Sequence, residues 1–141
     1  MIYLDAELAS ILMGFPATLL GLPIAGAAWL TGGAASVRDG VLEAHGGIVS
    51  VLLRRWVPIA GGALALTLGH IVLGRSAAAL DETRNHERIH VRQYERWGPF
   101  FLPAYLLASV YLLLAGHDCY YENPFERDAF APERAAGKFQ V

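Results

Sequence analysis

The sequence has little cysteine and little charge, and each shortage excludes some classes of protein. The single cysteine, Cys119, cannot form an internal disulfide and excludes a four-cysteine zinc module. Charged residues make up 17% of the 141 residues, whereas soluble domains carry about a quarter. The formal net charge of -2 provides no basic surface of the kind that binds nucleic acid. We therefore expect no nucleic-acid partner.

Basic residues are also missing from the first seven positions, which carry only the charges of Asp5 and Glu7. A secretory signal peptide needs a basic n-region, so we expect no cleaved signal. The chain is instead rich in hydrophobic residues (55%), and residues 8–30 contain no charge. Such a run is long enough to cross a hydrocarbon layer of about 30 Å. It predicts a transmembrane helix over residues 8–30.

Residues 37–74 are short apolar runs separated by glycines. Asp39-Gly40 and Gly46-Gly47 are turn signals, and the β-branched runs between them predict a small antiparallel sheet. We interpret residues 63–73 as one strand of this sheet, although a second spanning helix is an alternative. Residues 76–97 follow as a helix, which Ser76 or Asp81 can cap and which Gly98-Pro99 ends.

The motif of greatest interest lies in that helix: His86-Glu87-Arg88-Ile89-His90. Positions i and i+4 share a helix face, so both imidazoles can bind one metal ion while Glu87 stands beside them. This arrangement is typical of a zinc hydrolase whose glutamate is the general base. The alternative is a charged helix face that carries two solvated histidines.

A catalytic zinc site needs a third protein ligand, and no histidine follows at the spacing that some HExxH enzymes use. We expect the ligand to be Glu126, in a short helix over residues 123–131 that begins with Asn123 as cap. Two alternatives stay open. Glu126 could fold back onto the backbone as part of a capping box, or the segment His117-Asp118-Cys119 could supply the ligand.

The HExxH helix with Gln93, together with the downstream segment Asn123-Pro124-Phe125-Glu126 and Ala129, resembles the gluzincin branch of the zincin metallopeptidases. The likeness is greatest to small bacterial membrane-associated metallopeptidase-like proteins, and it covers roughly residues 69–130. It implies hydrolysis of peptide bonds, with His86, His90 and Glu126 on Zn2+ and Glu87 as base. One departure is Phe130, where these proteins usually carry an aspartate that supports a ligand histidine. Asp128 or Glu122 would have to replace that aspartate.

Several further polar residues are candidates for supporting roles. An oxyanion needs a hydrogen-bond donor, and the candidates here are Tyr94, His117, Tyr120 and Tyr121. His70 is more typical of a structural residue, with contact to metal or substrate as the alternative.

Residues 99–115 form a second uncharged run, too short to distinguish a crossing helix from an interfacial or a core helix. If both apolar runs crossed the membrane, Glu126 and His86 would lie on opposite sides, so we expect this run to turn back. The polar tail spans residues 132–141. The arginine-rich centre and the acidic N-terminus predict an active site at the cytoplasmic face, in a bacterial inner membrane.

Together these features predict a single α+β domain that works as a membrane-associated zinc peptidase on peptides near the bilayer. A second hypothesis is a non-catalytic membrane or assembly protein with a zincin-like fold and structural metal or none. A third is a zinc hydrolase of other amides. Nothing in the sequence sets the oligomeric state.

Overall fold

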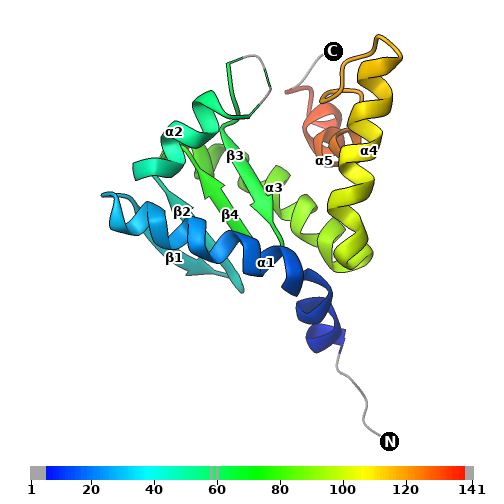
Figure 1. The fold of residues 1–141 in the computed structure, drawn as a ribbon. Coiled ribbons are helices and arrows are strands. Elements are labelled where there is room, and N and C mark those ends of the chain that lie inside the picture. The colour runs from blue at the N-terminus through cyan, green and yellow to red at the C-terminus, as the bar shows by residue number, and fades with distance from the viewer. Residues whose placement is uncertain (1–5, 58, 60, 139–141) are drawn as a thin grey trace, which may run out of the picture. The chain divides into compact units, whose positions relative to one another are not determined.

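The computed structural model describes residues 6–57, 59 and 61–138, which form two compact units, Met1–Pro99 and Phe100–Val141. The first contains, in chain order, α1 (Ala6–Leu30), β1 (Ala34–Arg38), β2 (Val41–His45), α2 (Gly47–Arg55), β3 (Ala65–Leu68), β4 (Ile71–Gly74) and α3 (Ala77–Trp97) (Figure 1). A 3-10 turn, η1 (Gly98–Phe100), precedes the helices of the second unit, α4 (Phe101–Leu114) and α5 (Pro124–Ala135). The α+β class expected from the sequence is confirmed.

The sheet has four strands in the order β1-β2-β4-β3 and is mixed. β1 pairs antiparallel with β2, and β3 with β4, while β2 and β4 run parallel. The turn expected at Asp39-Gly40 is confirmed, because both residues have positive φ, as a two-residue hairpin turn requires. The expectation of a purely antiparallel sheet is wrong for the central pair.

Two segments of the expected sheet have a different structure. Residues 47–55 form helix α2 rather than a strand, because parallel neighbours such as β2 and β4 need a crossover connection. Val49 and Leu53, one helical turn apart, are its buried residues. The run 63–73 is a hairpin rather than one strand, with Leu68 opposite Ile71 and Gly69 in the left-handed region.

Helix α1 covers one face of the sheet (Figure 1). Ala25 and Ala28 belong to the same buried cluster as Ile71 and Leu73 of β4 and Leu53 of α2. Alanines at this contact let the helix lie close to the strands. The cluster fixes the sheet against which α3 also packs.

A buried carboxylate joins α3 to the sheet. Glu43 of β2 is only 3% exposed and receives the guanidinium of Arg84, with Nε 3.1 Å from Oε2. Arg38 Nε and Arg88 Nη2 lie 3.6 Å and 4.0 Å from its Oε1. A buried anion needs such partners, so this cluster sets the position of α3 along β2.

The helix ends that the sequence predicted are largely confirmed. Ser76 caps α3 by accepting the amide of Ala79, and Gly98 ends it with a φ of 58°. Asn123 caps α5 by accepting the amide of Phe125. α5 is longer than expected and continues through Pro132 to Ala135, so the tail is shorter than residues 132–141. Residues 139–141 of that tail lie outside the described residues.

Two helical segments are long and apolar enough to cross a membrane, namely Leu8–Leu30 and Ala77–Leu114. The first is α1. The second combines α3, η1 and α4, and its α3 part carries eight charged side chains. Its apolar part is therefore α4, which has no charged residue.

Candidate metal centre

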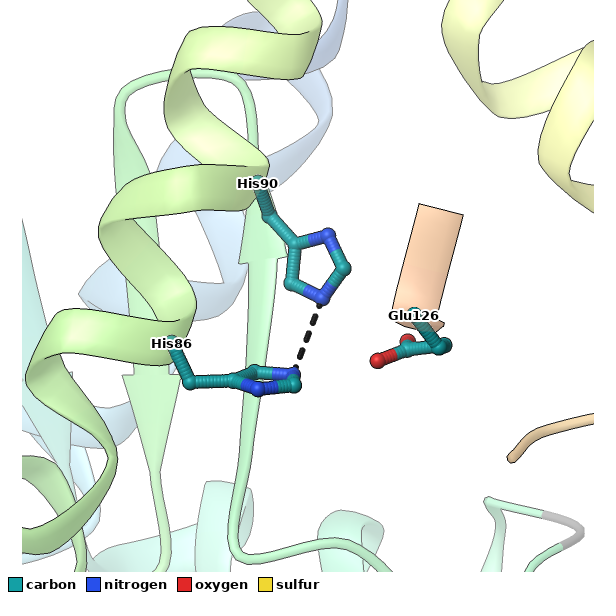
Figure 2. Close-up of side chains that lie close together, drawn as sticks. All are labelled: His86, His90 and Glu126. Atoms are coloured by element: carbon teal, nitrogen blue, oxygen red, sulfur yellow. Dashed lines mark hydrogen bonds between the residues drawn. The ribbon is translucent and has the colours of Figure 1, made fainter. Parts of the chain in front are cut away.

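The two histidines of the HExxH motif face each other on α3. His86 and His90 are both buried, at 5% and 7% exposure. Their Nε2 atoms lie 3.2 Å apart, and the rings meet edge to face (Figure 2). The alternative of two solvated histidines on an exposed helix face is therefore wrong.

This spacing fits a shared metal ion. Two imidazole nitrogens on one tetrahedral zinc, each about 2.0–2.1 Å from the ion, are about 3.3–3.4 Å apart. The observed 3.2 Å between the Nε2 atoms is close to that value. The separation is thus compatible with two ligands of one metal ion, and in the unliganded pair it is that of a hydrogen bond between the two imidazoles.

The orientation of His90 is set by Gln93, which is itself buried. His90 Nδ1 lies 2.8 Å from Gln93 Oε1. An amide oxygen only accepts hydrogen bonds, so Nδ1 carries the proton and Nε2 keeps its lone pair. Ligand histidines in metal sites are usually held in this way by a second hydrogen bond. The spacing H-x-x-Q, one helical turn, is the sequence signal for this partner.

Glu87 is buried beside β3 and is held by a residue that sequence analysis missed. Thr67 Oγ1 donates to Glu87 Oε2 at 2.6 Å. The two residues are 20 positions apart, and no motif relates them. The contact aligns the carboxylate of the expected base with strand β3.

Tyr94 also joins α3 to β3. Its hydroxyl donates to the carbonyl oxygen of Thr67 at 3.2 Å. Burial raises the pKa of Tyr94 well above its usual value, and the charge of Glu87 adds to that increase. The hydroxyl therefore stays protonated and remains a donor. Its expected role towards an oxyanion stays a prediction.

In the second unit, Glu126 is held by a side chain rather than by its own helix. It is 4% exposed, and Tyr105 Oη of α4 donates to its Oε1 at 2.6 Å. The alternative of a capping box is wrong, because the amide of Asn123 donates to the carbonyl of Tyr120. Asn123 in turn donates to Tyr105 O and Ser109 Oγ, which fixes the start of α5 on α4.

The three expected ligands are all buried, His86 and His90 on α3 of the first unit and Glu126 on α5 of the second. Figure 2 draws the three side chains. The set of two imidazoles and one carboxylate suits zinc.

Comparison with known proteins gives no match. No protein family, curated protein or solved structure is similar to this chain.

The remaining candidates of the second unit have local structural roles. His117 is exposed and its Nδ1 lies 3.2 Å from Glu122 Oε2. Asp118 Oδ1 accepts the amides of Tyr120 and Tyr121 and so closes the loop before α5. The rings of both tyrosines pack on Phe130. Asp128 is exposed, and Cys119 is half-buried. Their expected roles at the site stay predictions.

His70 lies in the turn between β3 and β4 and has a structural environment. Its Nε2 is 2.9 Å from Glu95 Oε1 of α3, and its amide donates to Thr18 Oγ1 of α1. These contacts connect two helices through the hairpin turn, as the structural interpretation of this residue predicts.

Proposed function

We propose that this chain is a membrane-associated zinc metallopeptidase. The observation that supports this most is the buried pair of imidazoles on α3, whose Nε2 atoms are separated as two ligands of one zinc ion would be. His86, His90 and Glu126 are the proposed ligands, which leaves a fourth position open, as catalytic zinc sites do. The HExxH motif alone would not distinguish a metal site from two surface histidines. The burial of His86 and His90 and the short distance between their Nε2 atoms favour the metal site.

Bound zinc would lower the pKa of a coordinated water towards neutrality and polarise a substrate carbonyl. Glu87 is the proposed general base, because it is the residue next to His86 in the sequence and its carboxylate is held by a hydrogen bond from Thr67. It would take a proton from water and return it to the leaving amine. Gln93 holds the neutral imidazole of His90 in the tautomer that leaves Nε2 available.

The proposed substrate is an extended peptide bound along β3. This strand is at one edge of the sheet and packs against α3. An edge strand can hold a peptide by adding it to the sheet through main-chain hydrogen bonds. Thr67 belongs to β3 and touches Glu87, so a peptide on this edge would pass close to the base.

The proposed location is the cytoplasmic face of a bacterial inner membrane. The two apolar helical segments support the membrane association. A shared zinc ion requires both ends of α4 to lie on the same side of the bilayer, so in this proposal α4 does not cross. The arginines of α3 favour the anionic cytoplasmic leaflet.

Metal removal tests the proposed function. We expect the full chain, purified in mild detergent with zinc, to cleave members of a mixed library of quenched fluorescent peptides. Dialysis against a zinc chelator should abolish cleavage, and added zinc should restore it, because the proposed water activation depends on the ion. Zinc-loaded protein that cleaves no member of the library would favour the non-catalytic alternative.

The Tyr105 hydroxyl tests whether Glu126 is a ligand. Tyr105→Phe removes the hydrogen bond to Glu126 Oε1 and is expected to weaken zinc binding about tenfold to a hundredfold, as outer-shell changes do. A competitive zinc titration measures this. Tyr111→Phe, on the exposed side of the same helix, is the matched control and should bind zinc as the unmodified chain does. Equal zinc affinity in both variants would contradict the role given to Glu126.

A further inference from the structure

Helix α1 has two different faces. The inner face consists of small residues that lie on the sheet, among them Gly14, Gly21, Ala25 and Ala28. A methyl group added to Gly14 would be 2.7 Å from the ring of His70, and one added to Gly21 would be 3.1 Å from Ile71. The helix is therefore in tight contact with the folded unit between Gly14 and Ala28.

The outer face of α1 is large, apolar and exposed. Its side chains are between 38% and 76% exposed and include Leu8, Ile11, Leu12, Met13, Phe15, Leu19, Leu20, Leu22, Trp29 and Leu30. No charged residue interrupts the run from residue 8 to residue 30. Exposed apolar faces of this extent mark interaction surfaces.

The contacts of the inner face argue against the crossing helix that the sequence predicted. The packed stretch from Gly14 to Ala28 is about 21 Å long at 1.5 Å per residue, which is most of a hydrocarbon layer of about 30 Å. A crossing α1 would carry the sheet into that layer, including the His70–Glu95 ion pair beside Gly14. β1 is an edge strand with all five residues exposed. Hydrocarbon offers no partners for its backbone groups.

The surroundings of α1 favour lipid as the occupant of its outer face. The chain has three tryptophans, and all are exposed at the C-terminal ends of helices: Trp29 on α1, Trp56 after α2 and Trp97 on α3. α2 and α3 both pack against α1. Tryptophan prefers the membrane interface. Arg54 and Arg55 precede Trp56, and Arg96 precedes Trp97. Arginines at these positions can bind anionic lipid headgroups.

We propose that α1 lies in the plane of a membrane surface, with its outer face in one leaflet and the sheet on the aqueous side. The sheet covers the inner face of α1, so only the outer face would enter the lipid, and the folded unit can bind through it without a crossing helix. The proposal does not depend on zinc or on hydrolysis.

Cysteine labelling at one position at the start of α1 and one in β1, after α1, tests the proposal. In the full chain carrying Cys119→Ser, the exposed residues Ala6 and Ser36 are replaced one at a time, as Ala6→Cys and Ser36→Cys. Sealed inverted and right-side-out inner-membrane vesicles are treated with a membrane-impermeant maleimide, and detergent-opened vesicles give full labelling as the control. We expect both cysteines to react in the inverted vesicles and neither in the right-side-out ones.

Other outcomes would overturn the proposal. Labelling of the two cysteines from opposite sides would show that α1 crosses the bilayer. A chain that stays out of the membrane fraction and forms a dimer in solution would show that a second copy covers the outer face. Each result is independent of peptide cleavage, so it can be separated from failure of the proposed function.

Discussion

Replacing Glu87 by glutamine is expected to lower peptide hydrolysis by about a hundredfold to ten-thousandfold, the usual contribution of a general base. Glutamine has the shape of glutamate and can still accept from Thr67 Oγ1, so the local structure should persist. It cannot take a proton from water at neutral pH. The zinc content should stay unchanged, because Glu87 is not a proposed ligand. Initial rates on the cleaved peptides, with zinc measured in the same samples, check this.

Glu82→Gln is the matched control for this change. Glu82 lies on the same helix but is exposed, and it should leave both rate and zinc content unaltered. Hydrolysis that continues at the normal rate in Glu87→Gln would remove Glu87 from the mechanism. A loss of zinc in that variant would instead indicate damage to the ligand pair.

Replacing His86 by alanine is expected to weaken zinc binding by more than the tenfold to hundredfold that outer-shell changes cause. The substitution removes one of the two imidazoles that lie 3.2 Å apart, and the remaining nitrogen cannot complete a three-ligand site. Zinc content after purification without chelator measures the effect. Circular dichroism of the same samples shows whether the helices persist.

His117→Ala tests whether the third zinc ligand is Glu126 or comes from the segment His117-Asp118-Cys119. His117 is exposed and pairs with Glu122 in the loop that the sequence offered as an alternative source of the third ligand. We expect this variant to keep its zinc. If His117→Ala lost zinc while His86→Ala kept it, the site would have to be rebuilt around that loop.

Features that depend on nearby residues could be predicted from the sequence. The bounds of α3 follow from Ser76 and Gly98, and the pairing of His86 with His90 follows from their spacing on one helix. Gln93 could be identified in the same way, because it lies one turn from His90. In each case the partners are three or four residues apart or mark a helix end.

Features that depend on tertiary structure could not be predicted from the sequence. Residues 47–55 have a β-branched pattern, and a helix there is favoured only by the parallel pairing of β2 with β4, which needs a crossover connection. Thr67 and Glu87 are 20 residues apart, and Tyr105 and Glu126 are 21 apart. No spacing rule relates such positions, so the hydrogen-bond partners of Glu87 and Glu126 became apparent only in the folded chain.

The central claim is that two imidazoles and one carboxylate bind one zinc ion, and X-ray absorption at the zinc edge of the zinc-loaded full chain tests it most directly. The account predicts nitrogen and oxygen ligands at about 2.0–2.2 Å, with the scattering of two imidazole rings and no sulfur. In the His86→Ala variant, the spectrum should show the scattering of one imidazole ring in place of two. A spectrum with a sulfur ligand at about 2.3 Å, or without imidazole scattering, would contradict the account.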